Sequence, residues 1–354
     1  MKNNRRWVCT DVWMDILPFF DRPQLGLKLA LLSPRFEVLV DKYFDGKGEL
    51  TIWRRIIIHK MGTKPMFTNY TNSMQFPLPD RPLPNKIRFK DLQIEYIDHF
   101  VITFLHANQQ IFDKGINLDL FLPYPNNAKN VQPVWDVFTR EIWPIFAKNI
   151  RHLKFTYHFD LENLRRHISP TILNDLDINS IRSDNLLPDA IADDGPNETS
   201  AGQALSKWLH TPTKNGKPKQ LRCCGDASKF IKLVNSFKEA FLDATNSSAS
   251  YIIQIDLDLF EPTEIEGFEL MNERTYEVLT LEKEENNDEN VDEDEDDEWD
   301  ERWIMKRCQI GQTATVKWED EKTDKLNNVK FTLGGFGPLS PPKAGQMNEK
   351  KSEN

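Results

Sequence analysis

The stretch that decides the fold class is Ile87-Arg-Phe-Lys-Asp-Leu-Gln-Ile-Glu-Tyr-Ile97, in which apolar and polar residues alternate as they do along a half-buried strand. A helix-like pattern follows over residues 99–112, and then a second strand-like run, Ile116-Asn-Leu-Asp-Leu-Phe-Leu122. The alternation predicts a region built of strand-helix units.

The same rhythm continues to about residue 259. Helix-like segments are expected over residues 134–147, 161–168, 201–210 and 230–244, and strand-like segments over 152–159, 172–178, 219–224 and 251–259. The strand starts lie about 20 to 45 residues apart, which is typical of irregular repeats like those of a leucine-rich horseshoe. A single open α/β sheet would leave the same pattern, and the spacing does not separate the two.

Residues 10–44 carry three short helical patterns. Val12, Ile16 and Phe20 recur at helical spacing, Asp21 is a plausible N-cap for the second helix, and Ser33-Pro34 is typical of the start of the third. A unit this small cannot bury so many large apolar residues by itself, so the surplus predicts a docking face. Packing of that face against the rest of the same chain is the alternative.

The remaining segments complete an expected α+β organisation. Residues 8–50 form the helical unit, 51–85 an irregular connector rich in Pro and Asn, 86–265 the strand-helix region, and 266–335 a small antiparallel sheet of short strands. Residues 282–301 are expected to be a disordered acidic insertion, because like charges such as those of Asp292–Glu298 repel one another. The polar tail, residues 336–354, is expected to be disordered too.

Composition narrows the class of protein. The net charge of −10 argues against binding to nucleic acid, and no run approaches the roughly 18 apolar residues of a membrane span. Four cysteines in 354 residues are too few for a disulfide scaffold. A soluble protein of the cytoplasm, or of the nucleus, is therefore expected, with no membrane partner.

Candidate chemistry is sparse, and neither a catalytic site, a cofactor site nor a metal site is predicted. Asp256-Leu-Asp258 could hold a divalent cation, but its alternating context makes the solvated face of a strand the preferred interpretation. His158 and Asp160 are interpreted as the end of a strand and the cap of a helix. Gly334-Gly-Phe-Gly337 is interpreted as a turn, and Cys223-Cys224 as buried thiols.

The helical unit, Val12-Trp-Met-Asp-Ile-Leu-Pro-Phe-Phe-Asp-Arg-Pro-Gln-Leu-Gly-Leu-Lys-Leu-Ala-Leu-Leu-Ser-Pro-Arg-Phe36, resembles the F-box. Downstream stretches such as Leu164-Arg-Arg-His-Ile-Ser-Pro-Thr-Ile-Leu173 are similar to those of the large nematode F-box protein family. The resemblance implies that the helices dock on a Skp-type adaptor bound to a cullin ligase core. The adaptor-binding residues would then be Val8, Val12, Ile16, Leu17, Phe20, Leu25, Leu29, Leu32 and Phe36.

The function that this resemblance implies is that of a non-catalytic substrate-recognition adaptor of a ubiquitin ligase, whose downstream region binds a target protein. Two departures from the family pattern bear on docking. Many F-boxes have Leu-Pro where Val8 and Cys9 stand, and Pro18 takes a position that commonly holds Ser. A protein interaction scaffold with a degenerate F-box is the alternative.

Overall fold

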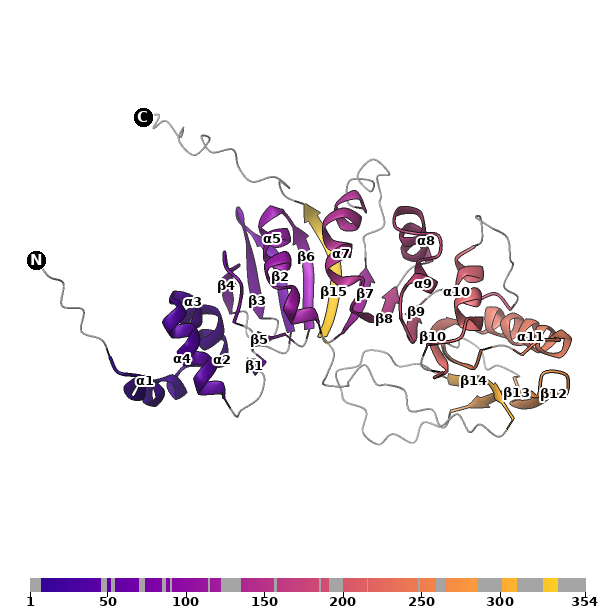
Figure 1. Cartoon of the computed structure of the whole chain (residues 1–354). Helices are drawn as coiled ribbons and strands as arrows, with labels where there is room; N and C mark the ends of the chain where they lie inside the picture. Colours follow the sequence, from indigo (N-terminus) through magenta and orange to yellow (C-terminus); the bar gives the residue numbers. More distant parts are fainter. Residues whose placement is uncertain are drawn as a thin grey trace, which may run out of the picture. The chain divides into compact units, whose positions relative to one another are not determined.

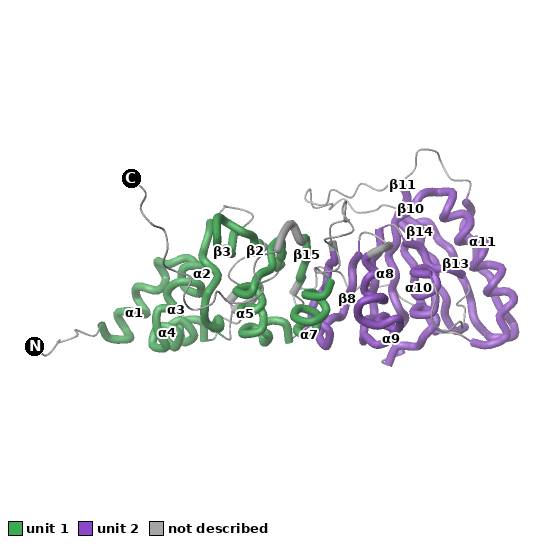
Figure 2. Tube along the Cα trace, turned by 90° about the horizontal axis from the view of Figure 1, so that it is seen from above, with its two compact units in different colours: residues 1–114, 122–145, 326–354 green, residues 115–121, 146–325 purple. Residues whose placement is uncertain are grey.

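The computed structural model describes residues 8–45, 50–51, 55–69, 74–84, 87–89, 91–113, 115–121, 135–155, 158–184, 186–190, 200–214, 216–247, 249–258, 265–284, 301–310 and 327–336. They form a mixed α/β protein in which N-terminal helices precede a mixed, largely parallel sheet interleaved with helices (Figure 1). Two compact units divide the chain (Figure 2). Unit 1 holds residues 1–114, 122–145 and 326–354, and unit 2 holds residues 115–121 and 146–325.

Unit 1 begins with the helical segments that the sequence predicts. These are α1 (Thr10–Ile16), the 3-10 turn η1 (Leu17–Phe19), α2 (Arg22–Gln24), the π-helical turn η2 (Leu25–Leu29), α3 (Ala30–Leu32) and α4 (Pro34–Phe44). Asp21 caps α2 as predicted, because its carboxylate accepts the backbone N–H of Gln24 over 2.7 Å. α4 begins at Pro34, where the absent N–H of proline costs no helical hydrogen bond.

The prediction that residues 51–85 form an irregular connector is wrong. It contains β2 (Arg55–Met61), β3 (Lys64–Asn69) and β4 (Gln75–Pro77), joined as antiparallel neighbours. Gly62, with φ of +62°, supplies the left-handed conformation that the tight β2–β3 turn requires. Burial of Ile56, Ile58 and Phe67 supplies the apolar contacts that hold these short strands in the sheet.

Four further strands lie in the described part of unit 1. β1 (Leu50–Thr51) pairs with β5 (Ile87–Arg88), and β6 (Asp91–Ile97) lies parallel to β2. β15 (Asn327–Phe336) lies parallel to β6 on the other side, a pairing that the antiparallel expectation for residues 266–335 missed. Gly334 and Gly335 belong to this strand, so the turn expected there is wrong. The register shifts between Phe331 and Gly335, and glycine commonly marks such an irregularity in a strand.

Short helices cover this part of the sheet. They are α5 (His99–Ala107), the 3-10 turn η3 (Gln109–Phe112), the π-helical turn η5 (Phe138–Ile142) and α7 (Trp143–Phe146). The ring of Phe138 meets that of Phe331 on β15 at 5.4 Å, edge to face. The helical pattern expected over residues 99–112 and 134–147 is thus confirmed for the residues that the structure describes.

In unit 2, five parallel strands follow one another in chain order: β7 (Ile116–Phe121), β8 (Ile150–Phe155), β9 (Ser180–Ser183), β10 (Lys219–Asp226) and β11 (Tyr251–Asp258). The connecting helices are α8 (His158–His167), α9 (Ile172–Asp175), α10 (Ala201–His210) and α11 (Ala227–Asp243). The strand expected over residues 172–178 is wrong. Ile172 and Leu173 are buried side by side in a helical turn, and β9 begins only at Ser180.

The antiparallel end of the chain extends the same sheet and is not separate from it. β14 (Glu301–Gln309) pairs with β11, β13 (Glu277–Lys283) pairs with β14, and β12 (Phe268–Asn272) forms the edge. The disorder expected over residues 282–301 and 336–354 is wrong at the described ends, because Glu282 and Lys283 belong to β13, Glu301 begins β14 and Phe336 ends β15. Residues 285–300 and 337–354 lie outside the described residues.

Helices of unit 2 gather on one face of its sheet (Figure 2). Right-handed crossovers between parallel strands that advance in one direction place every connecting helix on the same side. α11 packs on that side, where Phe237 meets Tyr251 at 6.1 Å and Phe230 meets Trp303 at 5.9 Å. Within unit 2 the strands therefore form a singly wound open sheet. The face opposite these helices carries polar side chains such as Arg182, Arg222 and Arg302.

Candidate functional site

The N-terminal helices are fastened to one another by a few specific contacts. The ring of Trp13 on α1 packs edge-on against Phe36 on α4, with centroids 4.8 Å apart. Nη2 of Arg35 donates to the carbonyl oxygen of Val8 over 2.5 Å. α1 is thereby held against α4, although none of the residues of α1 itself is buried.

Three of the nine predicted adaptor-binding residues form the interior of the helical unit. Leu17, Leu25 and Leu29 are at most 7% exposed. Their burial within the chain stabilises the fold and takes them off the accessible surface. Ile16, Phe20 and Phe36 are partly exposed, so each combines a packing role with a surface role.

The other three predicted residues are exposed, and two apolar neighbours that the sequence prediction did not include are exposed with them. The exposed fractions are 43% for Val8, 45% for Val12, 88% for Phe19, 64% for Leu32 and 66% for Val38. We call these five residues the exposed apolar set. Phe19 lies at helical spacing from Val12 and Ile16, but it follows Pro18 in a 3-10 turn and not in α1, and that proline was the available signal.

The exposed apolar set is concentrated at one end of the chain. The described residues include twelve large apolar side chains that are exposed, and five of them fall within residues 8–45. Single exposed apolar residues are normal on a protein surface, whereas a contiguous patch of them marks an interaction surface.

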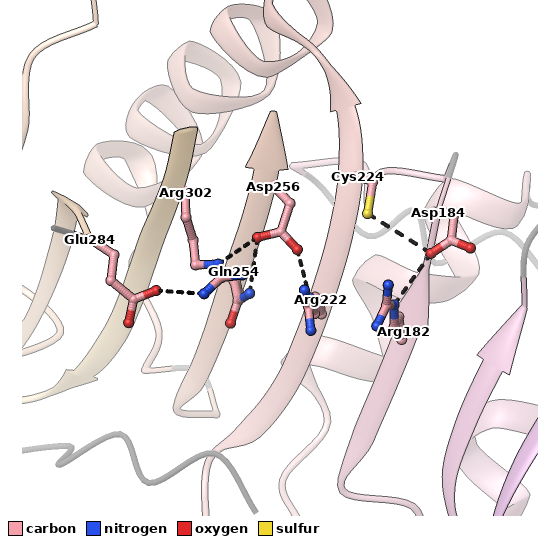
Figure 3. Close-up of polar contacts among 8 residues, drawn as sticks. All are labelled: Arg182, Asp184, Arg222, Cys224, Gln254, Asp256, Glu284 and Arg302. Atoms are coloured by element: carbon pink, nitrogen blue, oxygen red, sulfur yellow. Dashed lines mark hydrogen bonds and ion pairs between the residues drawn. The ribbon is translucent and has the colours of Figure 1, made fainter. Parts of the chain in front are cut away.

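A second feature lies on the polar face of the unit 2 sheet, around Asp256 of β11 (Figure 3). The carboxylate of Asp256 is fully buried. It accepts three hydrogen bonds, from Nε of Arg222 at 2.6 Å, from Nε of Arg302 at 2.8 Å and from Nε2 of Gln254 at 3.0 Å. Burial alone would lower the pKa of Arg302, but its hydrogen bond and its charge interaction with Asp256 raise it. We call Arg222, Asp256 and Arg302 the arginine clamp.

These contacts correct the interpretation of Asp256 as part of a solvated strand face. β11 lies between β10 and β14, so its polar side is flanked by arginines of both neighbours. Both oxygens of Asp256 accept guanidinium N–H groups, which leaves a cation little to bind. In the part of the chain that the structure describes, no group of three His, Cys, Asp or Glu side chains is placed to hold a metal ion. The side chain of Asp258 lies outside that part.

The other candidate groups have structural surroundings. β8 ends at Phe155, and both His158 and Asp160 lie in the first turn of α8, so neither residue ends the strand. Cys223 and Cys224 are buried, as predicted, and burial raises both thiol pKa values, that of Cys224 to about 12. A thiol with so high a pKa is a poor nucleophile at neutral pH.

Comparison with known proteins adds no counterpart: the chain matches no protein-family model, no curated protein and no solved structure. Among the described helices, none is long and apolar enough to cross a membrane. The exposed apolar set and the arginine clamp are therefore the two features of the described residues that bear on function.

Proposed function

We propose that this chain is a substrate-recognition adaptor of a cullin-type ubiquitin ligase. The N-terminal helices dock on a Skp-type adaptor, and the downstream sheet binds a target protein. The observation that carries the proposal is the exposed apolar set on the segment whose sequence resembles an F-box. The chain itself is a non-catalytic component, working in the cytoplasm or the nucleus.

The energetics favour docking through these residues. Burying one large apolar side chain in an interface stabilises a complex by about 1.5 to 3 kcal/mol before the costs of association are counted. Val12 lies on α1, Phe19 on η1 and Leu32 on α3, so three of the N-terminal helical segments each offer an exposed apolar side chain. Apolar anchors presented by helices to a groove, surrounded by polar residues, are a recurring mode of protein recognition.

The downstream region suits target binding because its parallel strands carry helices on one side and polar residues on the other. A leucine-rich-like arrangement presents a sheet face to its partner in this way. The interleaved strands and helices of unit 2 supply a rigid support for such a face.

Co-purification with a Skp-type adaptor tests the proposal. The full chain is expected to recover the adaptor and, through it, a cullin. Leu32→Glu and Val12→Glu are each expected to lower the affinity about tenfold or more, because a charge replaces an apolar anchor at the interface. Both residues are exposed, so the fold should tolerate the change. Leu242→Glu is the matched control, since Leu242 is 50% exposed on α11 of unit 2.

A second candidate function is that of an interaction scaffold outside any ligase. The burial of Leu17, Leu25 and Leu29 favours it, because three predicted anchors are already used inside the chain. If the folded full chain recovers no Skp-type adaptor, the scaffold function stands and the ligase function is wrong. If Leu32→Glu recovers as much adaptor as Leu242→Glu, Leu32 is not an anchor of the docking surface.

A further inference from the structure

We propose that the arginine clamp binds an oxyanion, a carboxylate or a phosphoryl group, on a target polypeptide. The inference deepens the proposed function, on which it rests for the nature of the bound molecule. It assigns the polar sheet face of unit 2 as the surface that captures the target, and acidic side chains as the feature that is recognised.

Several guanidinium N–H donors of Arg222 and Arg302 are not used by the contacts with Asp256 and Glu284. A guanidinium carries five N–H donors in a planar fork. Arg222 uses only Nε, toward Oδ2 of Asp256, and within the described residues its two Nη groups have no partner. Arg302 uses Nε toward Oδ1 of Asp256 and Nη1 toward Glu284, so its Nη2 has no partner among the same residues. Two arginines held by one carboxylate thus keep three amino groups for a ligand.

These amino groups face solvent. The side chains of Arg222 and Arg302 are 24% and 31% exposed, whereas that of Asp256 is fully buried. Among the described residues, Nη1 and Nη2 of Arg222 and Nη2 of Arg302 lack a hydrogen-bond partner, and none of these three nitrogens is buried. The carboxylate therefore orients both guanidiniums from below, and their outer ends remain open. Holding the donors in place beforehand reduces the entropy that a ligand must overcome.

The surrounding charges set the strength of the site. Asp256 neutralises one of its two arginines, and Glu284, 37% exposed, contacts Nη1 of Arg302 at 3.5 Å. Glu284 is therefore an internal competitor for any anion that approaches Arg302. On the neighbouring strand, Arg182 stands in register with Arg222 and pairs with Asp184 at 3.4 Å. On β14, four residues after Arg302, Lys306 pairs with Glu282 of β13 at 2.8 Å.

The chemistry of the donors selects the ligand class. The Nη1 and Nη2 groups of Arg222 form a fork that matches the spacing of oxygens in a carboxylate or a phosphoryl group, and Nη2 of Arg302 adds a single donor. Charge-assisted bonds of this kind are about twice as strong as neutral ones. Because the nearby cations Arg182 and Lys306 already have carboxylate partners, the face offers a local anion site and not a continuous basic track. A discrete acidic group on a polypeptide fits this pattern better than a polyanion.

Fluorescence anisotropy with labelled peptides tests the inference on the full chain. One twelve-residue peptide carries spaced glutamates, a second carries glutamines at the same positions, and a third carries phosphoserine in the glutamine background. The glutamate or the phosphoserine peptide is expected to bind, and the two arms tell which oxyanion is preferred. Inorganic phosphate is expected to displace the bound peptide. Equal binding of the glutamine peptide would overturn the proposal.

Variants locate the site. Arg222→Gln is expected to weaken binding about tenfold, because it removes two partner-free Nη groups and one charge. Arg166→Gln removes the same charge from an exposed position of α8 and is expected to leave binding unchanged. Glu284→Gln is expected to tighten binding by about threefold or more, because the internal competitor loses its charge. This gain of affinity cannot arise from misfolding.

The outcomes separate this inference from the proposed function. Arg222→Gln should still recover a Skp-type adaptor to the same extent as the unaltered chain. If no acidic peptide binds even to Glu284→Gln, or if Arg222→Gln and Arg166→Gln bind equally well, the arginine clamp is only a structural ion-pair cluster. That result would leave adaptor docking untouched.

Discussion

Nη2 of Arg307 on β14 donates to Oε2 of Glu277 on β13 over 2.7 Å, and the two side chains are only 6% and 1% exposed. The guanidinium also lies 5.2 Å from the ring of Phe241 on α11. This buried ion pair thus joins the antiparallel strands to the longest helix of unit 2 on the side opposite the arginine clamp.

Removing one member of that pair should be costly. Glu277→Gln leaves the Arg307 charge buried without its anion, and the free energy of unfolding is expected to fall by about 3 to 5 kcal/mol. Urea denaturation measures the loss. Asp177→Asn is the control in the same unit, because Asp177 pairs with Arg151 at 3.7 Å at an exposed site, and about 1 kcal/mol or less is expected. Equal losses for the two variants would contradict the prediction.

Lys219 should make stability depend on pH in the alkaline range. Burial lowers its pKa from 10.5 to about 8, although Nζ donates to the carbonyl oxygen of Trp208 and lies 4.9 Å from its ring centroid. Because the folded state prefers the neutral amine, the charged ammonium that is present below pH 8 destabilises the folded protein by about 3 kcal/mol. The free energy of unfolding is expected to rise as pH increases from about 8 to 10.5.

The variant Lys219→Met isolates this effect. Its free energy of unfolding should lack that rise, and at pH 7 it should exceed the value for the unaltered chain by about 1 kcal/mol, since the lost hydrogen bond offsets part of the gain. Lys207→Met changes an exposed lysine of α10 and should keep the rise. A rise that persists in Lys219→Met would assign it to other titrating groups.

Asn272 should be one of the most sensitive positions in unit 2. Its buried amide donates to the carbonyl oxygens of Phe241 at 2.6 Å and Ala244 at 3.0 Å, and its Oδ1 accepts the N–H groups of Arg274 and Thr275. Asn272→Ala leaves these groups without partners, and a loss of about 2 to 4 kcal/mol is expected in urea denaturation. Asn246→Ala, at an exposed position shortly after α11, should change stability by less than about 0.5 kcal/mol.

Substitution of Tyr276 by glycine should stabilise the protein, in contrast to the changes at Glu277 and Asn272. Its φ of 56° places it in the left-handed region, which costs a residue with a Cβ atom about 1 kcal/mol, and its side chain is 70% exposed. Tyr276→Gly is expected to raise the free energy of unfolding by about 0.5 to 1 kcal/mol. Tyr276→Ala removes the ring but keeps the strain, so it should show no gain. Thermal unfolding of the pair separates backbone strain from loss of the ring.

The sequence was informative wherever an element is decided by its own periodicity. The helix over residues 201–210 lies where it was predicted, and β11 begins at Tyr251 as expected, because the alternation of buried and solvated positions is a local property. The predictions were wrong where neighbouring apolar residues follow neither the helical nor the strand periodicity. Ile172-Leu173 belongs to a helical turn, and β2 and β3 lie in a segment whose Pro and Asn content resembled a loop.

The candidate sites divide in the same way. Helical spacing located the N-terminal helices and two of the exposed apolar residues, Val12 and Leu32, whereas Val8 was named only through the resemblance to the F-box. Spacing cannot tell an apolar residue that faces the chain's own interior from one that faces outward, so Leu17, Leu25 and Leu29 had the same signature.

By itself, the amino-acid sequence determined the alternation of helices and strands and the resemblance of the N-terminal segment to an F-box. Only the tertiary structure decided that β15 pairs with β6 and that Asp256 is buried between Arg222 and Arg302, which lie 34 and 46 residues away along the chain. The physical reason is that periodicity records which side chains share a face. What that face meets depends on strand pairings between distant segments, and those are set by the free energy of the whole fold.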